Sequence, residues 1–151
     1  MKGQSTGGGR AGAYGLRALA LMLGVFFIFN AIDKLAWFAD SSILAQRLEG
    51  WLQDAAPSTR WYIETVAVPG VPLFARLVPL AELSTGVALI LGFWTRLVAV
   101  LAFLMVANLH VARGFIYEWE FLIDGTGLPV LGGLLALALG TSRLPLSVSK
   151  G

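Results

Sequence analysis

Glu82 is the residue whose position most strongly indicates chemistry, because it is a carboxylate inside the apolar stretch from Val78 to Arg96. A charged carboxylate at the centre of a membrane helix costs about 3 kcal/mol on insertion scales. Either a partner group offsets this cost, or the carboxylate stays there because it serves a function. The stretch therefore predicts either a group that handles protons or a structural ion pair.

Further polar side chains are predicted to lie near Glu82, at the same end of the apolar helices. Titratable groups that gather in apolar surroundings often mark functional sites. The candidates for proton handling are Glu82 and His110. The candidates for binding a substrate or ligand are Asn30, Asp33, Arg76, Asn108 and Arg113.

Each of these residues also has a structural interpretation. Charged side chains near helix ends, such as Lys34 and Arg113, often extend to the membrane surface as anchors. Side-chain amides, such as those of Asn30 and Asn108, often join helices through hydrogen bonds. A lone histidine such as His110 can be a satisfied buried residue. The sequence leaves both interpretations open.

The partner of Glu82 is expected to come from another helix. Arg76 precedes Glu82 by six positions, which is about 240° around an ideal helix, so the two side chains point in different directions. His110 and Arg113 are the better candidates. Glu82 shares a helix face with Gly86, Leu89 and Phe93. The glycine on that face allows a neighbouring helix to approach closely.

The composition is that of a membrane protein. Of the 151 residues, 57% are hydrophobic and 13% are charged, and the mean hydropathy is +0.76. An average soluble domain has about 25% charged residues. Because the chain has no cysteine and one histidine, no metal site and no cofactor bound by such ligands are expected within it. The net charge of +2 is too small to predict nucleic acid binding.

The apolar blocks are long enough to cross a bilayer, which takes about 20 residues per helix. The predicted fold is an all-α, polytopic membrane four-helix bundle with a short extracytoplasmic amphipathic helix between helices 1 and 2. The four-helix domain is expected at 14–146, between a flexible glycine-rich tail at 1–13 and a short tail at 147–151. The spans are expected at about 16–34, 73–92, 97–114 and 121–140, with a cap at 36–72.

Two parts of this arrangement are less regular. The amphipathic helix is predicted at 41–52, with Ser41 or Ser42 as N-cap, and lies either on the membrane surface or over the mouth of the bundle. The fourth span has a clean apolar run only at 128–140. Either residues 121–127 form its outer half or the helix is off centre.

The distribution of charge predicts the orientation. The terminal segments and the turn at Thr95-Arg96 carry six basic residues and no acidic one: Lys2, Arg10, Arg17, Arg96, Arg143 and Lys150. All nine acidic residues fall in the other loops or in the helix halves nearer to them. Because cytoplasmic loops are enriched in Lys and Arg, both termini are expected in the cytoplasm and the cap outside.

Two motifs resemble a known family. One reads Gly24-x-x-Phe27-x-x-Asn30-x-x-Asp33-Lys34-Leu35, and the other Pro79-x-x-Glu82-x-x-x-Gly86-x-x-Leu89-x-x-Gly92-x-x-Thr95-Arg96. Together they resemble the DoxX family of small four-helix membrane proteins, which includes the DoxD-type subunit of thiosulfate:quinone oxidoreductase. The resemblance implies a multi-pass protein of the bacterial inner (cytoplasmic) membrane. It carries over the Glu82 and Thr95-Arg96 positions directly.

The resemblance and the polar residues together give two functional hypotheses. In the first, the chain is a subunit of a membrane-associated oxidoreductase of sulfur or respiratory metabolism, binds a quinone, and handles protons around Glu82. In the second, it is a non-catalytic interaction subunit or assembly factor whose cap docks an extracytoplasmic partner. The expected partners are the lipid bilayer and either another protein or a second copy of the chain. Whether the chain is itself an enzyme stays open.

Overall fold

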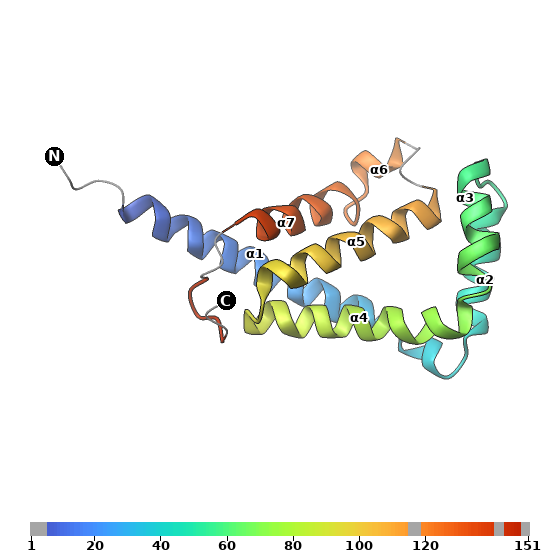
Figure 1. Cartoon of the computed structure of the whole chain (residues 1–151), viewed down its shortest axis with the longest axis horizontal. Helices are drawn as coiled ribbons and strands as arrows, with labels where there is room; N and C mark the ends of the chain where they lie inside the picture. The colour runs from blue at the N-terminus through green and yellow to red at the C-terminus, as the bar shows by residue number, and fades with distance from the viewer. Residues whose placement is uncertain (1–5, 115–118, 141–143, 149–151) are drawn as a thin grey trace.

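The structure is a computed structural model that describes residues 6–114, 119–140 and 144–148 (Figure 1). All regular elements in these ranges are helical, which confirms the predicted all-α class. In chain order they are α1 (Thr6–Asp33), η1 (Leu35–Phe38), α2 (Ser42–Leu52), α3 (Pro57–Tyr62), η2 (Ile63–Ala67), α4 (Val71–Leu91), α5 (Thr95–Arg113), α6 (Glu120–Ile123) and α7 (Leu128–Leu139).

Within the described residues, three helices are long and apolar enough to cross a membrane: α1, α4 and α5. The observed α4 and α5 begin and end within two residues of the predicted spans at 73–92 and 97–114. Helix α7 is apolar but has 12 residues, which is about 18 Å at 1.5 Å per residue. That is shorter than the hydrocarbon core, which is about 30 Å thick.

Helix α1 begins earlier than predicted. It starts at Thr6, so residues 6–13 belong to this helix rather than to the flexible tail expected at 1–13. Residues 1–5 lie outside the described part of the chain. A glycine is less favourable than alanine in a helix by about 1 kcal/mol, which is more than the small gain from each residue added to an existing helix. Local helix propensity therefore does not explain the extension of α1 back to Thr6.

The fourth predicted span is not one helix. The chain between 121 and 140 divides into α6 and α7, joined by a short connection. In this connection the Asp124 carboxylate accepts hydrogen bonds from the Thr126 backbone N–H at 3.1 Å and from its hydroxyl at 2.6 Å. This Asx turn competes with helix continuation, and α7 begins at Leu128 with Pro129 in its first turn. Of the two interpretations of the fourth stretch, residues 121–127 therefore do not form the outer half of one helix, and the apolar run from Leu128 is a separate short helix.

The long helices pack around one apolar core. Helix α1 lies along α4, α5 lies along α7, and contacts between α4 and α5 and between α1 and α7 complete the arrangement (Figure 1). The buried core residues are Ala20, Leu23, Phe27, Leu89, Ala99, Ala102, Val106, Val130, Leu134, Leu137 and Leu144. The core comes from all four of these helices, so α7 is part of the same packed unit as the three long helices.

Two glycines set the close approach of α1 and α4. A Cβ atom at Gly86 would lie 2.7 Å from the backbone oxygen of Gly24, and one at Gly24 would lie 2.9 Å from the backbone oxygen of Gly86. The buried face of α4 includes Glu82, Gly86 and Leu89, as predicted. Phe93 is not on it. Gly92, with φ of 69°, ends the helix, and Phe93 stacks on Trp94 in the turn that follows.

The segment between α1 and α4 forms a separate cap over one end of the long helices (Figure 1). Its core contains Trp37, Leu44, Leu48, Ile63, Ala67, Val71 and Ala75. The apolar face of α2 packs against η1, η2 and α4, so α2 covers the end of these helices. Neither Ser41 nor Ser42 caps it through a side chain, because the Asp40 carboxylate accepts the Ser42 N–H at 2.8 Å. Hydrogen bonding from Ser42 lowers the pKa of Asp40.

The opposite end is held by a buried arginine. The Arg17 guanidinium donates to the backbone oxygens of Leu89 and Ile90 at 2.9 and 2.6 Å and to that of Leu146 at 3.1 Å. Carbonyls at the end of an α-helix have no partners within the helix and carry partial negative charge. Arg17 satisfies two of them and joins the segment at 144–148 to α4.

We expect Gly86→Ala to destabilise the protein, because the added methyl group has no space between α1 and α4. Overpacking of this kind costs about 1–3 kcal/mol. The measurement is unfolding of the purified protein in mixed detergent micelles. Gly132→Ala in α7 is the matched control, since nothing lies within 4 Å of a Cβ there. Equal stability of the two variants would contradict the close approach.

Candidate functional site

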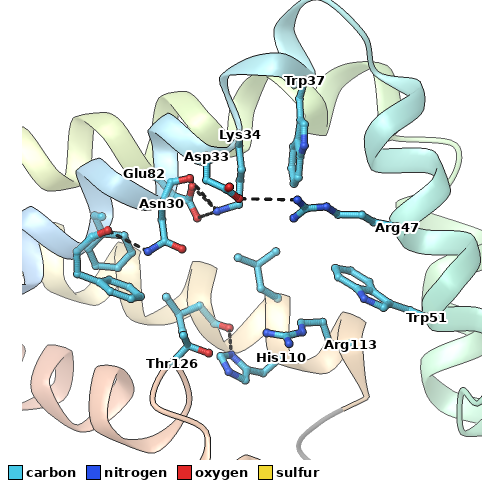
Figure 2. Close-up of a pocket in the computed structure, with 14 residues that line it drawn as sticks. Asn30, Asp33, Lys34, Trp37, Arg47, Trp51, Glu82, His110, Arg113 and Thr126 are labelled. Carbon is cyan, nitrogen blue, oxygen red and sulfur yellow. Dashed lines mark hydrogen bonds and ion pairs between the residues drawn. The ribbon is translucent and has the colours of Figure 1, made fainter.

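A cavity of about 450 Å³ lies where the cap meets the long helices (Figure 2). Its wall combines aromatic rings with charged and polar side chains from α1, η1, α2, α4, α5 and the connection between α6 and α7. The lining residues are Phe26, Phe27, Asn30, Asp33, Lys34, Trp37, Arg47, Trp51, Glu82, Val106, Leu109, His110, Arg113 and Thr126.

A buried ion pair between Lys34 and Glu82 forms one side of this cavity (Figure 2). The Lys34 Nζ atom lies 2.8 Å from both carboxylate oxygens of Glu82 and donates a further hydrogen bond to the Asn30 backbone oxygen at 3.1 Å. Lys34 is 8% exposed and Glu82 is 3% exposed. Buried charges of opposite sign in such close contact offset part of each other's desolvation cost.

The predicted partner of Glu82 was therefore wrong. Lys34 makes the ion pair, not His110 or Arg113. Lys34 comes four residues after Asn30, and its Nζ atom donates to the Asn30 backbone oxygen at 3.1 Å. Lys34 follows directly on the end of α1, and its long side chain can turn back along α1 toward α4. The side chain thus extends into the protein, not outward as a membrane anchor.

The second side of the cavity is an aromatic and basic group from the cap. Trp37 is buried, and the Arg47 guanidinium lies 5.2 Å from the centre of its ring, a distance at which a cation–π interaction is favourable. Arg47 Nη2 also lies 3.7 Å from Asp33 Oδ2. Figure 2 shows Trp51 beside Arg47, with both side chains directed toward the cavity.

His110 forms part of the third side and is held by two elements. Its Nδ1 atom lies 2.8 Å from the Val106 backbone oxygen. Because a carbonyl only accepts hydrogen bonds, Nδ1 must carry a proton. The Phe121 ring packs edge-on at 5.5 Å. The Nε2 atom has no hydrogen-bond partner within the described residues, and Asp124 Oδ2 lies 3.7 Å from it.

Five of the seven predicted site residues line this one cavity: Asn30, Asp33, Glu82, His110 and Arg113. The other two do not. Arg76 is exposed and donates to the Pro72 backbone oxygen on its own helix. Asn108 is exposed and accepts a hydrogen bond from the Tyr62 hydroxyl at 2.8 Å. The structure therefore brings the first five residues together and places the other two elsewhere.

Several residues of the wall are not predicted from the sequence as site residues. Lys34 is one of them, although it stands in the same motif as Asn30 and four positions beyond it. Trp37, Arg47 and Trp51 lie in the cap, whose position over the cavity depends on how the chain turns back after α1. No pattern in the sequence marks Thr126 as a residue of the cavity wall.

The geometry can bind a ligand that has both an apolar ring and polar atoms. Aromatic rings supply stacking surface, and Arg47 and Arg113 supply N–H donors that no shift of pH near neutrality removes. In the described part of the chain, no three or more His, Cys, Asp or Glu side chains come together as a group that could hold a metal ion.

These features define a multi-pass, all-helical membrane protein with a polar cavity beneath a helical cap. The DoxX family model matches residues 15–112, and the chain belongs to the DoxX family. The match ends before the connection between α6 and α7, so the wall around Thr126 lies outside it. No curated protein and no solved structure matches the chain.

The ion pair predicts a non-additive pattern of stability. Glu82→Leu alone leaves a buried, unpaired Lys34, and breaking a buried pair in this way costs about 3–5 kcal/mol. The double variant Lys34→Met/Glu82→Leu removes both charges and should recover most of that loss. Unfolding of the single and double variants in mixed micelles measures the coupling. A double variant as unstable as the sum of the two single variants would show that the groups act independently.

Proposed function

We propose that this DoxX family protein is a subunit of a membrane-associated oxidoreductase and that its cavity binds the headgroup of a quinone. The observation that carries the proposal is the combination of aromatic walls and fixed cations around a space of about 450 Å³. Ligand sites in proteins commonly measure about 300–1,000 Å³ and combine apolar walls with a few polar groups. A quinone ring is planar and apolar on its faces, and its carbonyl oxygens accept hydrogen bonds.

In this proposal the ring packs against the aromatic side chains and the carbonyl oxygens face the cations. Trp37 and Trp51 offer stacking surface on the cap side, and Arg113 offers N–H donors on the α5 side. Asn30 lines the cavity from α1, with its amide nitrogen bound to the Phe26 backbone oxygen. The same cavity also suits the reduced form, whose hydroxyl groups can donate to the carboxylates of the wall.

Glu82 and His110 are the proposed proton-handling groups. A quinone that receives electrons from a partner subunit must also take up protons on its oxygens. Glu82 lies within the apolar helix α4 but is held by Lys34 beside the cavity, so its carboxylate is a group that can exchange a proton with the ligand. Electron transfer is assigned to the partner, because this chain has no cysteine and one histidine with which to hold a redox centre.

We further propose a four-span topology in the bacterial inner membrane, with α7 as a short fourth span. Helices α1, α4 and α5 are long enough to cross, and α7 packs beside α1 and α5. Arg10 and Arg17 lie in the N-terminal half of α1 and Arg96 lies in the first turn of α5. The starts of both helices lie away from the cap in Figure 1, which supports a cytoplasmic location for both termini. Lys2, Arg143 and Lys150 lie outside the described residues.

A non-catalytic role as an interaction subunit or assembly factor is the second candidate. Trp61 on α3 is 63% exposed, and exposed tryptophans are enriched among residues that dominate protein interfaces. Of the other predicted docking aromatics, Trp51 lines the cavity and Tyr62 bonds Asn108. A photo-crosslinking residue at position 61 would identify a partner, and failure to recover one from native membranes would count against this role.

The binding proposal predicts that Arg113→Gln weakens quinone binding about tenfold, the loss of about 1.4 kcal/mol expected for one hydrogen bond to a charged donor. Binding is measured by quenching of tryptophan fluorescence with a short-chain quinone in nanodiscs. Arg60→Gln is the matched control, because Arg60 bonds Leu52 and Glu64 on the surface and not in the cavity. Absence of saturable quenching in the wild-type protein would refute the proposal.

The oxidoreductase role requires a separate measurement. Protein purified with its native lipids and partners should reduce quinone with thiosulfate or sulfide as the electron donor, and Glu82→Gln should slow that reduction about 100-fold, as removal of a positioned proton-transfer group does. The folded double variant Lys34→Met/Glu82→Leu separates loss of the carboxylate from loss of structure. Unchanged turnover in Glu82→Gln would exclude the proposed proton role.

A further inference from the structure

The connection between α6 and α7 brings a carboxylate to the edge of the cavity. The ligand-binding proposal does not use this carboxylate. Asp124 lies in this connection, and its side chain is 23% exposed. It does not line the cavity itself. Two residues that do line the cavity, Thr126 and His110, both reach it. Asp124 is therefore the contact between the cavity wall and the outside of the protein on this side.

Both contacts end on the same oxygen atom. The Thr126 hydroxyl donates to Asp124 Oδ2 at 2.6 Å, and His110 Nε2 lies 3.7 Å from that same Oδ2 atom. The other oxygen, Oδ1, accepts the Thr126 backbone N–H. Because the carboxylate is fixed through Oδ1, Oδ2 is the oxygen that remains directed toward the two cavity residues.

The imidazole is arranged so that its proton exchange takes place on the Asp124 side. Its Nδ1 proton is committed to the Val106 backbone oxygen, which leaves Nε2 as the exchanging atom. Nε2 is buried and has no hydrogen-bond partner within the described residues. An unprotonated Nε2 directs its lone pair toward a carboxylate, whereas a protonated Nε2 directs an N–H toward it. Asp124 Oδ2 is therefore the group that Nε2 faces.

Other charged groups lie near His110 and Asp124. Arg113 lies on the same helix as His110 and acts on Asp124 through its charge, while the Lys34–Glu82 pair lies across the cavity on α1 and α4 (Figure 2). Hydrogen bonding from the Thr126 side chain lowers the pKa of Asp124. At neutral pH Asp124 is therefore a carboxylate, which is the form that can receive a proton.

We propose that Asp124 is a positioning and proton-relay residue that connects the cavity with bulk water through Thr126 and His110. The proposal rests on the ligand-binding function proposed above. A hydronium ion gives a proton to Asp124 Oδ2 and is left as water. Protonated Oδ2 becomes the donor in its hydrogen bond with Thr126 Oγ1, so the Thr126 hydroxyl turns to donate to a ligand oxygen in the cavity. Oδ2 then passes its proton to Oγ1 as the hydroxyl gives its own proton to that ligand oxygen, and each transfer breaks one O–H bond and forms another. Oδ2 can also exchange its proton with His110 Nε2, which returns the proton to Oδ2.

Proton uptake during reduction of bound quinone tests the relay. Short-chain naphthoquinone is bound to the full-length protein in nanodiscs and reduced anaerobically with dithionite, while a pH dye follows proton uptake. Asp124→Asn should slow uptake about 100-fold, the lower range for a positioned proton-transfer group, with quinone affinity within about twofold of wild type. Thr126→Val should slow uptake as well. Glu64→Gln, an exposed carboxylate of the cap, is the control.

A second measurement needs no ligand. The chain has one histidine, so ¹⁵N-histidine labelling reports His110 alone by NMR. The rate at which Nε2 gains and loses a proton, followed by the line width of its ¹⁵N signal, should be at least about tenfold slower in Asp124→Asn, because the buried nitrogen loses its route to solvent. Wild-type uptake rates or wild-type exchange in a folded Asp124→Asn protein would overturn the relay. A wild-type protein that binds no quinone would refute the binding function, and the exchange measurement would still decide the role of Asp124.

Discussion

The structure depends on one buried ion pair. Lys34 and Glu82 join the end of α1 to the middle of α4, and they do so where Gly24 and Gly86 allow the two backbones to touch. Without the pair, each charge would lie in apolar surroundings with no compensation. The close approach of the helices and the ion pair together fix one wall of the cavity.

The cap completes the cavity because it has a core of its own. Trp37, Leu44 and Leu48 pack against the start of α4, and this packing orients the polar face of α2. Arg47 is consequently held against Trp37 and near Asp33, and Trp51 faces the same space. Helix α2 thus contributes a charged and aromatic wall to the cavity, while its apolar face attaches the helix to the rest of the protein.

Much of the architecture could be predicted from the sequence. The long apolar stretches predict the ends of α4 and α5 to within two residues. Helical spacing predicts the buried face that contains Glu82, Gly86 and Leu89. One difference has a local cause: the turn formed by Asp124 and Thr126 separates α6 from α7, and hydropathy does not measure such a turn. The extension of α1 back to Thr6 is not explained by the helix propensity of its glycines.

The sequence by itself determined that this is an all-α membrane protein, that it resembles the DoxX family, and that Glu82 must be offset by another group. These conclusions follow from composition, periodicity and the cost of a buried charge, which are properties of the chain alone. Only the tertiary structure decided that Lys34 offsets Glu82, that Arg76 and Asn108 lie elsewhere, and that Asp124 meets His110. Such pairings depend on distances between helices, and those are set by packing at glycines and turns far from the residues that meet.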